Sequence, residues 1–329
     1  MCIIMKKYLG ILLATALVTG LTACGSSGTA AAPSEAAPAV EEAAPSEAAP
    51  AEEPAPVEEK AGEAAPSETA EASTEAGEDT EIQVFIAASL STVMEEVAAK
   101  YNEQHPNVKI TYNADSSGTL LTQIEEGYAC DVFFSAAQKQ MNTLEEDDKL
   151  VVEGTRSNVV NNQVCVITLK DSGTKVTGLK DIGNASSIAL ADGSVPVGKY
   201  TRQAMVNAGM LKEVDDVSKI TTQEVSEQLG GVEISEQSNV SKVLAAVTEG
   251  SCEVGTTYFS DTYGFEDKVE ILEKVPYDLT GNVIYPIAQI VNDEADDAEK
   301  VAALDFVNFV TSDEAKAIFE KYYFDTDVE

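Results

Sequence analysis

The chain of 329 residues carries 57 acidic and 21 basic residues, which gives a formal net charge of −36. This length suffices for one or two globular domains. No basic stripe is present, so the composition argues against binding to nucleic acid. An anion site in so acidic a chain must depend on neutral donors and dipoles. The five cysteines fit neither a zinc site nor a CxxC motif: Cys2, Cys24, Cys130, Cys165 and Cys252.

The first 24 residues have the features of an export signal. Lys6 and Lys7 precede an apolar run over residues 8–18, which is too short for a stable membrane-spanning helix. Leu21-Thr-Ala-Cys24 resembles a bacterial lipobox, which implies a signal peptide over 1–23 and lipid attachment at Cys24. The protein would then be anchored on the extracytoplasmic face of the cell membrane. A simple secretory signal with a chance cysteine is the alternative.

Residues 24–80 are predicted to be a disordered linker. The pattern Ala-Ala-Pro-Ser-Glu occurs three times, and residues 25–80 hold 14 acidic residues and one base, Lys60. A segment rich in Ala, Pro and Glu buries too little apolar area to fold, and proline and like charge keep it extended. It serves either as a spacer above the membrane or as an inert tail.

Two strand-to-helix junctions carry small hydroxyl residues. A buried strand is expected over 81–88, with Ser89 as a helix N-cap, and a second strand over 108–112 leads through Ser116 and Ser117 into a helix. In a right-handed parallel βαβ unit, both junctions lie at one edge of the sheet. Free N–H groups and hydroxyls at helix starts suit an oxyanion, although plain capping explains them locally.

Strands and helices continue to alternate, which favours an α/β fold. We expect an apolar strand over 159–169 to cross into a second lobe and a long strand over 282–291 to return. Cys165 in the first of these should be a buried small hydrophobe, and a disulfide among the last three cysteines is left open. The remaining assignments are a helix over 200–208, a polar segment over 221–236 without a clear element, a helix over 239–249 capped by Ser238 or Asn239, a strand over 252–258, and closing helices over 295–309 and 313–322.

Residues 81–329 resemble the periplasmic-type molybdate-binding proteins of ABC importers. The resemblance implies a two-lobed type II periplasmic-binding-protein fold with two crossings between lobes, lobe I at 81–160 and 283–329 and lobe II at 161–282. The segment from Thr222 to Glu236 is longer than the family pattern. The matching motifs are Phe85-Ile-Ala-Ala-Ser-Leu90, Ser116-Ser-Gly-Thr-Leu120, Asp131-Val-Phe-Phe-Ser-Ala136, Val195-Pro-Val-Gly-Lys-Tyr200, Val240 to Val247, Gly255-Thr-Thr-Tyr258 and Tyr285-Pro-Ile-Ala288.

The resemblance also implies five ligand-binding positions. Ser89, Ser117 and Tyr258 would supply hydroxyl groups, and Val197 and Val240 would supply backbone N–H groups. Molybdenum would be bound only as its oxyanion, with no separate metal site and no cofactor. The implied protein is a binding protein rather than an enzyme. It would be a monomer that delivers molybdate or tungstate to a permease and an ATPase.

The expected chemistry agrees with a fully ionised tetrahedral dianion, which needs donors only. A carboxylate acceptor would favour a protonated ion such as phosphate and would repel a dianion, so Asp115 must point away from the site. Three alternatives stay open: a binder of sulfate or another oxyanion, a surface adhesin, and a hydrolase. The hydrolase would need a Ser–His pair, and His105, the only histidine, lies in a His-Pro turn.

Overall fold

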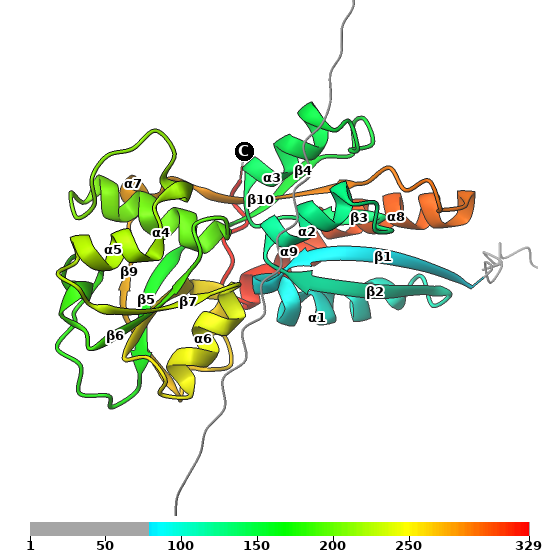
Figure 1. Cartoon of the computed structure of the whole chain (residues 1–329). Coiled ribbons are helices and arrows are strands. Elements are labelled where there is room, and N and C mark those ends of the chain that lie inside the picture. The colour runs from blue at the N-terminus through cyan, green and yellow to red at the C-terminus, as the bar shows by residue number, and fades with distance from the viewer. Residues whose placement is uncertain (1–78, 329) are drawn as a thin grey trace, which may run out of the picture. The chain divides into compact units, whose positions relative to one another are not determined.

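The computed structural model describes residues 79–328. The predicted signal peptide over 1–23, the lipidation site Cys24 and nearly all of the linker lie outside the described residues. Within these, no helix is long and apolar enough to cross a bilayer. Two five-stranded mixed sheets organise the described chain (Figure 1), in the orders β2-β1-β3-β10-β4 and β7-β6-β8-β5-β9.

The first sheet contains β1–β4 and β10. Ile82, Val84 and Ile86 of β1 pack into the core on one face, beneath helices that include α1 and α8, and Phe85 packs on the other face with α2 and α3. This alternation is the two-residue period of a strand covered on both faces. The elements are β1 (Thr80–Ala87), η1 (Ala88–Leu90), α1 (Ser91–Asn102), β2 (Val108–Asp115), α2 (Ser117–Glu125), β3 (Val132–Phe134), α3 (Gln138–Asn142), η2 (Thr143–Asp147), β4 (Ser157–Asn162), β10 (Val283–Gln289), α8 (Asp297–Val310) and α9 (Asp313–Lys321).

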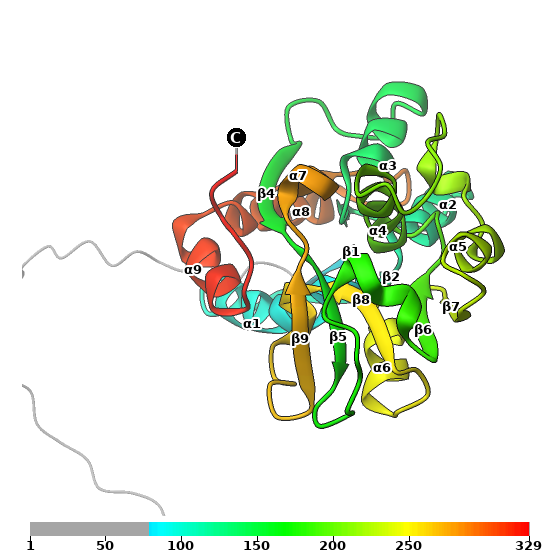
Figure 2. The same cartoon turned by 90° about the vertical axis from the view of Figure 1, so that its left-hand side faces the viewer.

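The second sheet contains β5–β9, and α4 and α6 both pack on β5, β6 and β8. Figure 2 turns this sheet toward the viewer. Cys165 in β5 is fully buried, as predicted, and Cys130, Cys165 and Cys252 are all free and buried. The elements are β5 (Val164–Leu169), η3 (Leu179–Asn184), β6 (Ser187–Ala191), α4 (Pro196–Asn207), η4 (Val217–Lys219), α5 (Thr222–Gln228), β7 (Glu233–Gln237), α6 (Val240–Thr248), β8 (Val254–Tyr258), η5 (Phe259–Thr262), β9 (Val269–Lys274) and α7 (Tyr277–Thr280).

The two crossings between the sheets have different forms. The predicted strand over 159–169 is two strands, β4 and β5, which belong to different sheets and are separated by Gln163 alone. The return crossing runs from β9 through α7 into β10. The fold is the predicted two-lobed α/β architecture. The division of lobe I and lobe II at residues 160/161 and 282/283 stays a proposal, and β4 itself continues to Asn162.

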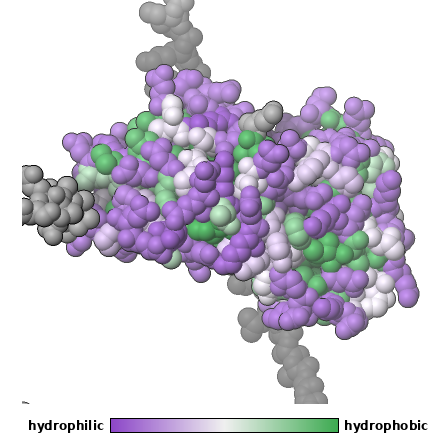
Figure 3. Space-filling view, turned by 180° about the vertical axis from the view of Figure 1, so that it is seen from behind, coloured by the Kyte–Doolittle hydropathy of each residue, from purple (hydrophilic) through white to green (hydrophobic). Residues whose placement is uncertain are grey.

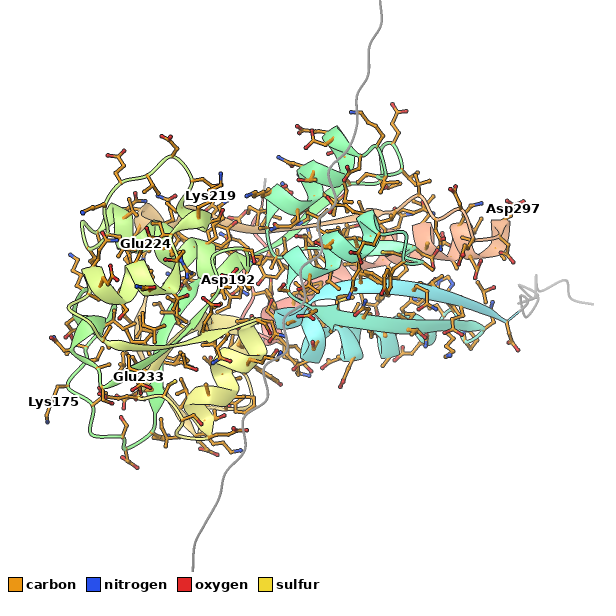
Figure 4. The ribbon with its side chains drawn as sticks, in the orientation of Figure 1. Lys175, Asp192, Lys219, Glu224, Glu233 and Asp297 are labelled. Atoms are coloured by element: carbon orange, nitrogen blue, oxygen red, sulfur yellow. The ribbon has the colours of Figure 1, made fainter. Side chains whose placement is uncertain are left out.

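The surface of the described residues is largely hydrophilic. In Figure 3 hydrophilic residues cover most of the rear face, with smaller hydrophobic areas between them. The labelled side chains of Lys175 and Asp297 lie at opposite outer ends in Figure 4, and that of Asp192 lies nearer the junction between the two sheets.

Candidate oxyanion site between the lobes

The ends of adjacent parallel strands set the geometry of the site. β1 and β2 pair in parallel with Ala87 opposite Asp115, so η1 and α2 begin side by side, as the sequence predicts. In the second lobe β6 and β7 pair in parallel with Ala191 opposite Gln237. These strands lead into α4 and α6 in the same way. Each lobe therefore presents two helix starts at one sheet edge.

These helix starts meet around one small cavity. The cavity is small: about 10 Å³ is open to a water-sized molecule, far below the roughly 300–1,000 Å³ of pockets for drug-sized ligands. All five positions implied by the resemblance line it. The lining residues are Ala87, Ala88, Ser89, Ser116, Ser117, Ala136, Val195, Pro196, Val197, Val240 and Tyr258.

Backbone N–H groups at the first turns of three α-helices are available to a ligand. Ser117 and Val240 are the first residues of α2 and α6, and Val197 is the second residue of α4. At these positions an N–H has no acceptor within its own helix. Three helix dipoles with their positive ends at the cavity favour negative charge there.

The N-cap residues of the helices at the site differ in part from the sequence prediction. Ser116, not Ser117, caps α2, and its Oγ accepts a hydrogen bond from Thr119 N at 3.1 Å. Ser89 is no N-cap, because a short 3-10 helix precedes α1 and the N-cap Leu90 makes no side-chain bond. Asn239 caps α6 through Lys242 N at 3.0 Å, as expected.

α4 begins earlier than predicted. The sequence Gly193-Ser-Val-Pro-Val-Gly198 suggests a turn, but Pro196 is the first residue of the helix. Proline fits there because the first position has no intrahelical bond to lose and needs a φ near that of proline. Val197 therefore lies inside the first helical turn, which directs its N–H along the helix axis.

The three hydroxyl groups differ in their protein partners. Ser117 Oγ accepts a hydrogen bond from Ala136 N at 2.9 Å, which leaves its proton to donate. Ser89 Oγ lies 2.8 Å from Tyr285 Oη. Tyr258 Oη is buried and has no hydrogen-bond partner among the described residues. Burial raises the pKa of Tyr258 well above its ordinary value, so this hydroxyl keeps its proton.

No charged side chain lines the cavity. Asp115 Oδ1 accepts hydrogen bonds from Ser116 N at 2.7 Å and from Asn239 Nδ2 at 3.1 Å, and the residue is not part of the lining. Asp115 is thus not part of the cavity wall, and it bridges β2 of one lobe to the cap of α6 in the other. Arg202 is fully buried in α4, but its donors bond Ile220 O, Ala191 O, Gly198 O and Thr222 Oγ1.

The described chain matches a family of transport proteins. The model of the bacterial extracellular solute-binding proteins matches residues 82–325. The chain belongs to this family. Among other relatives, the molybdate-binding protein ModA of Haemophilus influenzae is 27% identical to this solute-binding protein over 253 residues, which cover 74% of this chain and 89% of the relative.

Solved structures agree with this family fold. A substrate-binding domain assigned to a molybdenum ABC transporter from Clostridium difficile is 33% identical, with a TM-score of 0.55, and the match covers 76% of this chain and all of that domain. The sulfate-binding protein SubI of Mycobacterium tuberculosis is 14% identical with a TM-score of 0.60, covering 75% of this chain and 88% of SubI. The second likeness shows the fold alone.

Asp261 lies three residues after Tyr258 of this solute-binding protein, and its carboxyl group titrates at an unusual pH. Burial raises the pKa of its carboxyl group from 3.8 to about 6, against the opposing effect of hydrogen bonds from Thr257 Oγ1 at 2.7 Å and Tyr258 N at 2.9 Å. The folded protein therefore takes up a proton at a higher pH than the unfolded chain. The stabilisation that this proton gives the folded protein is complete below the pKa of Asp261 in the unfolded chain. It is lost as the pH rises through about 6.

We predict that Asp261→Asn removes this pH dependence. The amide oxygen can still accept from Thr257 and Tyr258, and the side chain no longer ionises. The free energy of unfolding of the variant relative to the unsubstituted protein should rise by about 3 kcal/mol between about pH 3 and pH 7. Urea unfolding at several pH values measures this difference, and a constant difference across the range would contradict the prediction.

Proposed function

We propose that this protein captures molybdate or tungstate between its two lobes and delivers it to the permease and ATPase of an ABC importer. The observation that carries the proposal is a small cavity at which three α-helices begin and which only neutral residues line. The molybdate-binding relative and the molybdenum-transporter domain support the choice of ion. A lipid on Cys24 would hold the monomeric protein at the extracytoplasmic face of the membrane.

In this proposal Ser89, Ser117 and Tyr258 donate from their hydroxyl groups. Ser117, Val197 and Val240 donate from the backbone, and Ser89 adds its own N–H at the start of η1. Hydrogen bonds from neutral donors to an ionised oxygen are short and strong, so a dianion can be held without a cation. Lobe closure excludes water and strengthens each bond. The protein needs no cofactor and performs no reaction, and molybdenum is present only within the oxyanion.

Sulfate is the second candidate, because it is also a fully ionised tetrahedral dianion and the sulfate-binding protein SubI shares the fold. The two ions need the same donors and differ in size. The dimensions of the closed cavity therefore decide between them.

Titration calorimetry on the full-length chain in detergent tests the proposal. We expect tight binding of molybdate and tungstate, with sulfate and phosphate weaker by about 100-fold or more, since a size mismatch or an unmatched ligand proton each costs a few kcal/mol in a dry site. Tight binding of sulfate with weak binding of molybdate would replace the proposed ligand by sulfate. No binding of any of the four ions would refute oxyanion capture.

A further inference from the structure

A chain of buried hydrogen bonds reaches Ser89 from the crossing between the lobes. Asn162 is the last residue of β4, and Gln163 separates it from β5 of the other sheet. Asn162 Nδ2 lies 2.8 Å from Ser260 Oγ and 3.1 Å from Tyr285 Oη, and Tyr285 Oη lies 2.8 Å from Ser89 Oγ. Asn162, Ser260, Tyr285 and Ser89 are all buried.

Asn162 determines which group donates and which accepts in each of these hydrogen bonds. Asn162 Oδ1 accepts from Gln163 N at 2.9 Å, so the amide nitrogen has to face Tyr285 and Ser260. An amide nitrogen only donates. Tyr285 Oη is therefore an acceptor toward Asn162, and its own proton must go elsewhere.

Ser89 Oγ is the acceptor within reach of the Tyr285 proton. Tyr285 is fully buried, and burial raises the pKa of its hydroxyl well above the ordinary value, so the proton is present. Leaving a buried donor unpaired is costly. The ring of Tyr258 contacts that of Tyr285 with centroids 5.9 Å apart, but Tyr258 Oη forms no hydrogen bond with Tyr285 or with any other residue that the structure describes. Ser89 Oγ thus accepts from Tyr285.

We propose that Asn162 and Tyr285 are positioning residues that make Ser89 an obligate donor into the oxyanion cavity and thereby exclude ions that carry a proton. Because Tyr285 donates to Ser89 Oγ, the Ser89 proton cannot point toward Tyr285, and the ligand is the acceptor left for this O–H. Ser117 is fixed in the same way by Ala136 N. A hydroxyl that accepts the proton of hydrogen phosphate would leave its own buried proton without an acceptor, which is costly, whereas a fully ionised oxyanion accepts from every hydroxyl.

This inference rests on the proposed function and predicts how selectivity depends on a residue that does not line the cavity. In Tyr285→Phe, the donor that holds the Ser89 hydroxyl in place is lost, so the Ser89 O–H becomes free to turn away from the cavity and leave a lone pair facing a ligand. The ratio of molybdate affinity to phosphate affinity should fall about tenfold or more, because the ligand proton gains a partner. A purely structural role for Tyr285 would weaken both ions equally and leave the ratio unchanged.

Asn162→Asp should have the stronger effect, because it reverses donor and acceptor in each hydrogen bond between residue 162 and Ser89. A carboxylate accepts from both Gln163 N and Tyr285 O–H, so Tyr285 Oη then accepts from Ser89, and Ser89 turns a lone pair toward the cavity. The ratio should fall about 100-fold, since one bond is lost for molybdate and one is gained for hydrogen phosphate. The new charge repels both ions alike at about pH 8.5, where phosphate is mostly a dianion, and so cancels in the ratio.

Calorimetry of the full-length protein and the two variants with molybdate and phosphate at about pH 8.5 tests the inference. Tyr112→Phe is the matched control, because Tyr112 Oη donates to Met94 O at 2.9 Å and does not line the cavity; its ratio should stay unchanged. If the unsubstituted protein binds molybdate but both variants keep its selectivity ratio, the positioning role is refuted. If the unsubstituted protein does not bind molybdate, the proposed function itself fails.

Discussion

Tyr258→Phe is expected to weaken molybdate binding about 10- to 100-fold while leaving the unliganded protein as stable as before or more stable. A hydrogen bond to a charged partner contributes about 1.5–3 kcal/mol, which is the expected loss of binding free energy. In the unliganded protein, Tyr258 Oη is buried without a hydrogen-bond partner within residues 79–328. Removing this hydroxyl also removes its desolvation penalty, so the free energy of unfolding should rise by about 1 kcal/mol.

Ser117→Ala is the contrasting variant, because its hydroxyl has a structural partner. Ser117 Oγ accepts from Ala136 N in the folded protein, and both residues are buried. Its removal should weaken binding to a similar extent and also lower the free energy of unfolding by about 1–3 kcal/mol, since the Ala136 N–H is left unpaired.

Calorimetry gives the affinities of both variants, and urea unfolding without ligand gives their stabilities. Unchanged affinity in both variants would remove these hydroxyls from the site. A Tyr258→Phe protein that is clearly less stable than the unsubstituted one would show that this tyrosine is an ordinary core residue.

The sequence predicts best those parts of the site in which local patterns and strand order coincide. The strand–helix junctions at Ser89 and Ser117 lie together because β1 and β2 are parallel neighbours with aligned ends. The amphipathic pattern from Val240 and the cap at Asn239 place the start of α6 correctly. The five positions taken from the resemblance line one cavity, and their binding of a ligand remains a prediction.

The elements that the sequence does not reveal lie at the edges of the second sheet. β7 is an edge strand in which no residue is fully buried, so it shows no apolar pattern. α5 before it has one buried residue, Val225. β9 is the other edge strand and is rich in charge. Such strands are held by pairing with their neighbours, which a local pattern does not record.

Sequence patterns also fail to predict polar contacts between residues that are far apart in the sequence, but for a different reason. Asn162 and Tyr285 are 123 positions apart, and Asp115 and Asn239 are 124 apart. Neither pair belongs to a periodic motif. Only the two crossings, which bring β4, β5 and β10 together, place these side chains within hydrogen-bonding distance.

Gly198→Ala is expected to lower the free energy of unfolding by about 3 kcal/mol or more, because overpacking against backbone atoms cannot be relieved by a side-chain rotation. Gly198 lies in the first turn of α4, and an added Cβ would lie 2.0 Å from Asp192 O and 2.5 Å from Ala191 O. These carbonyls belong to the end of β6 and the loop after it. Relief requires α4 to move off the sheet, which also displaces the Val197 N–H, so molybdate binding should be lost.

Gly118→Ala is the matched control, since Gly118 occupies the first turn of α2 at the same cavity. Its added Cβ would lie 3.1 Å from Ser194 O, which precedes α4 in the other lobe. This contact exists only when the lobes are together, so opening relieves it. The free energy of unfolding should change by less than about 1 kcal/mol, while the affinity for molybdate falls about fivefold because closure is disfavoured. Urea unfolding and calorimetry separate the two variants. Equal loss of stability in both would mean that Gly118 packs within its own lobe, and that the contact with Ser194 does not report closure.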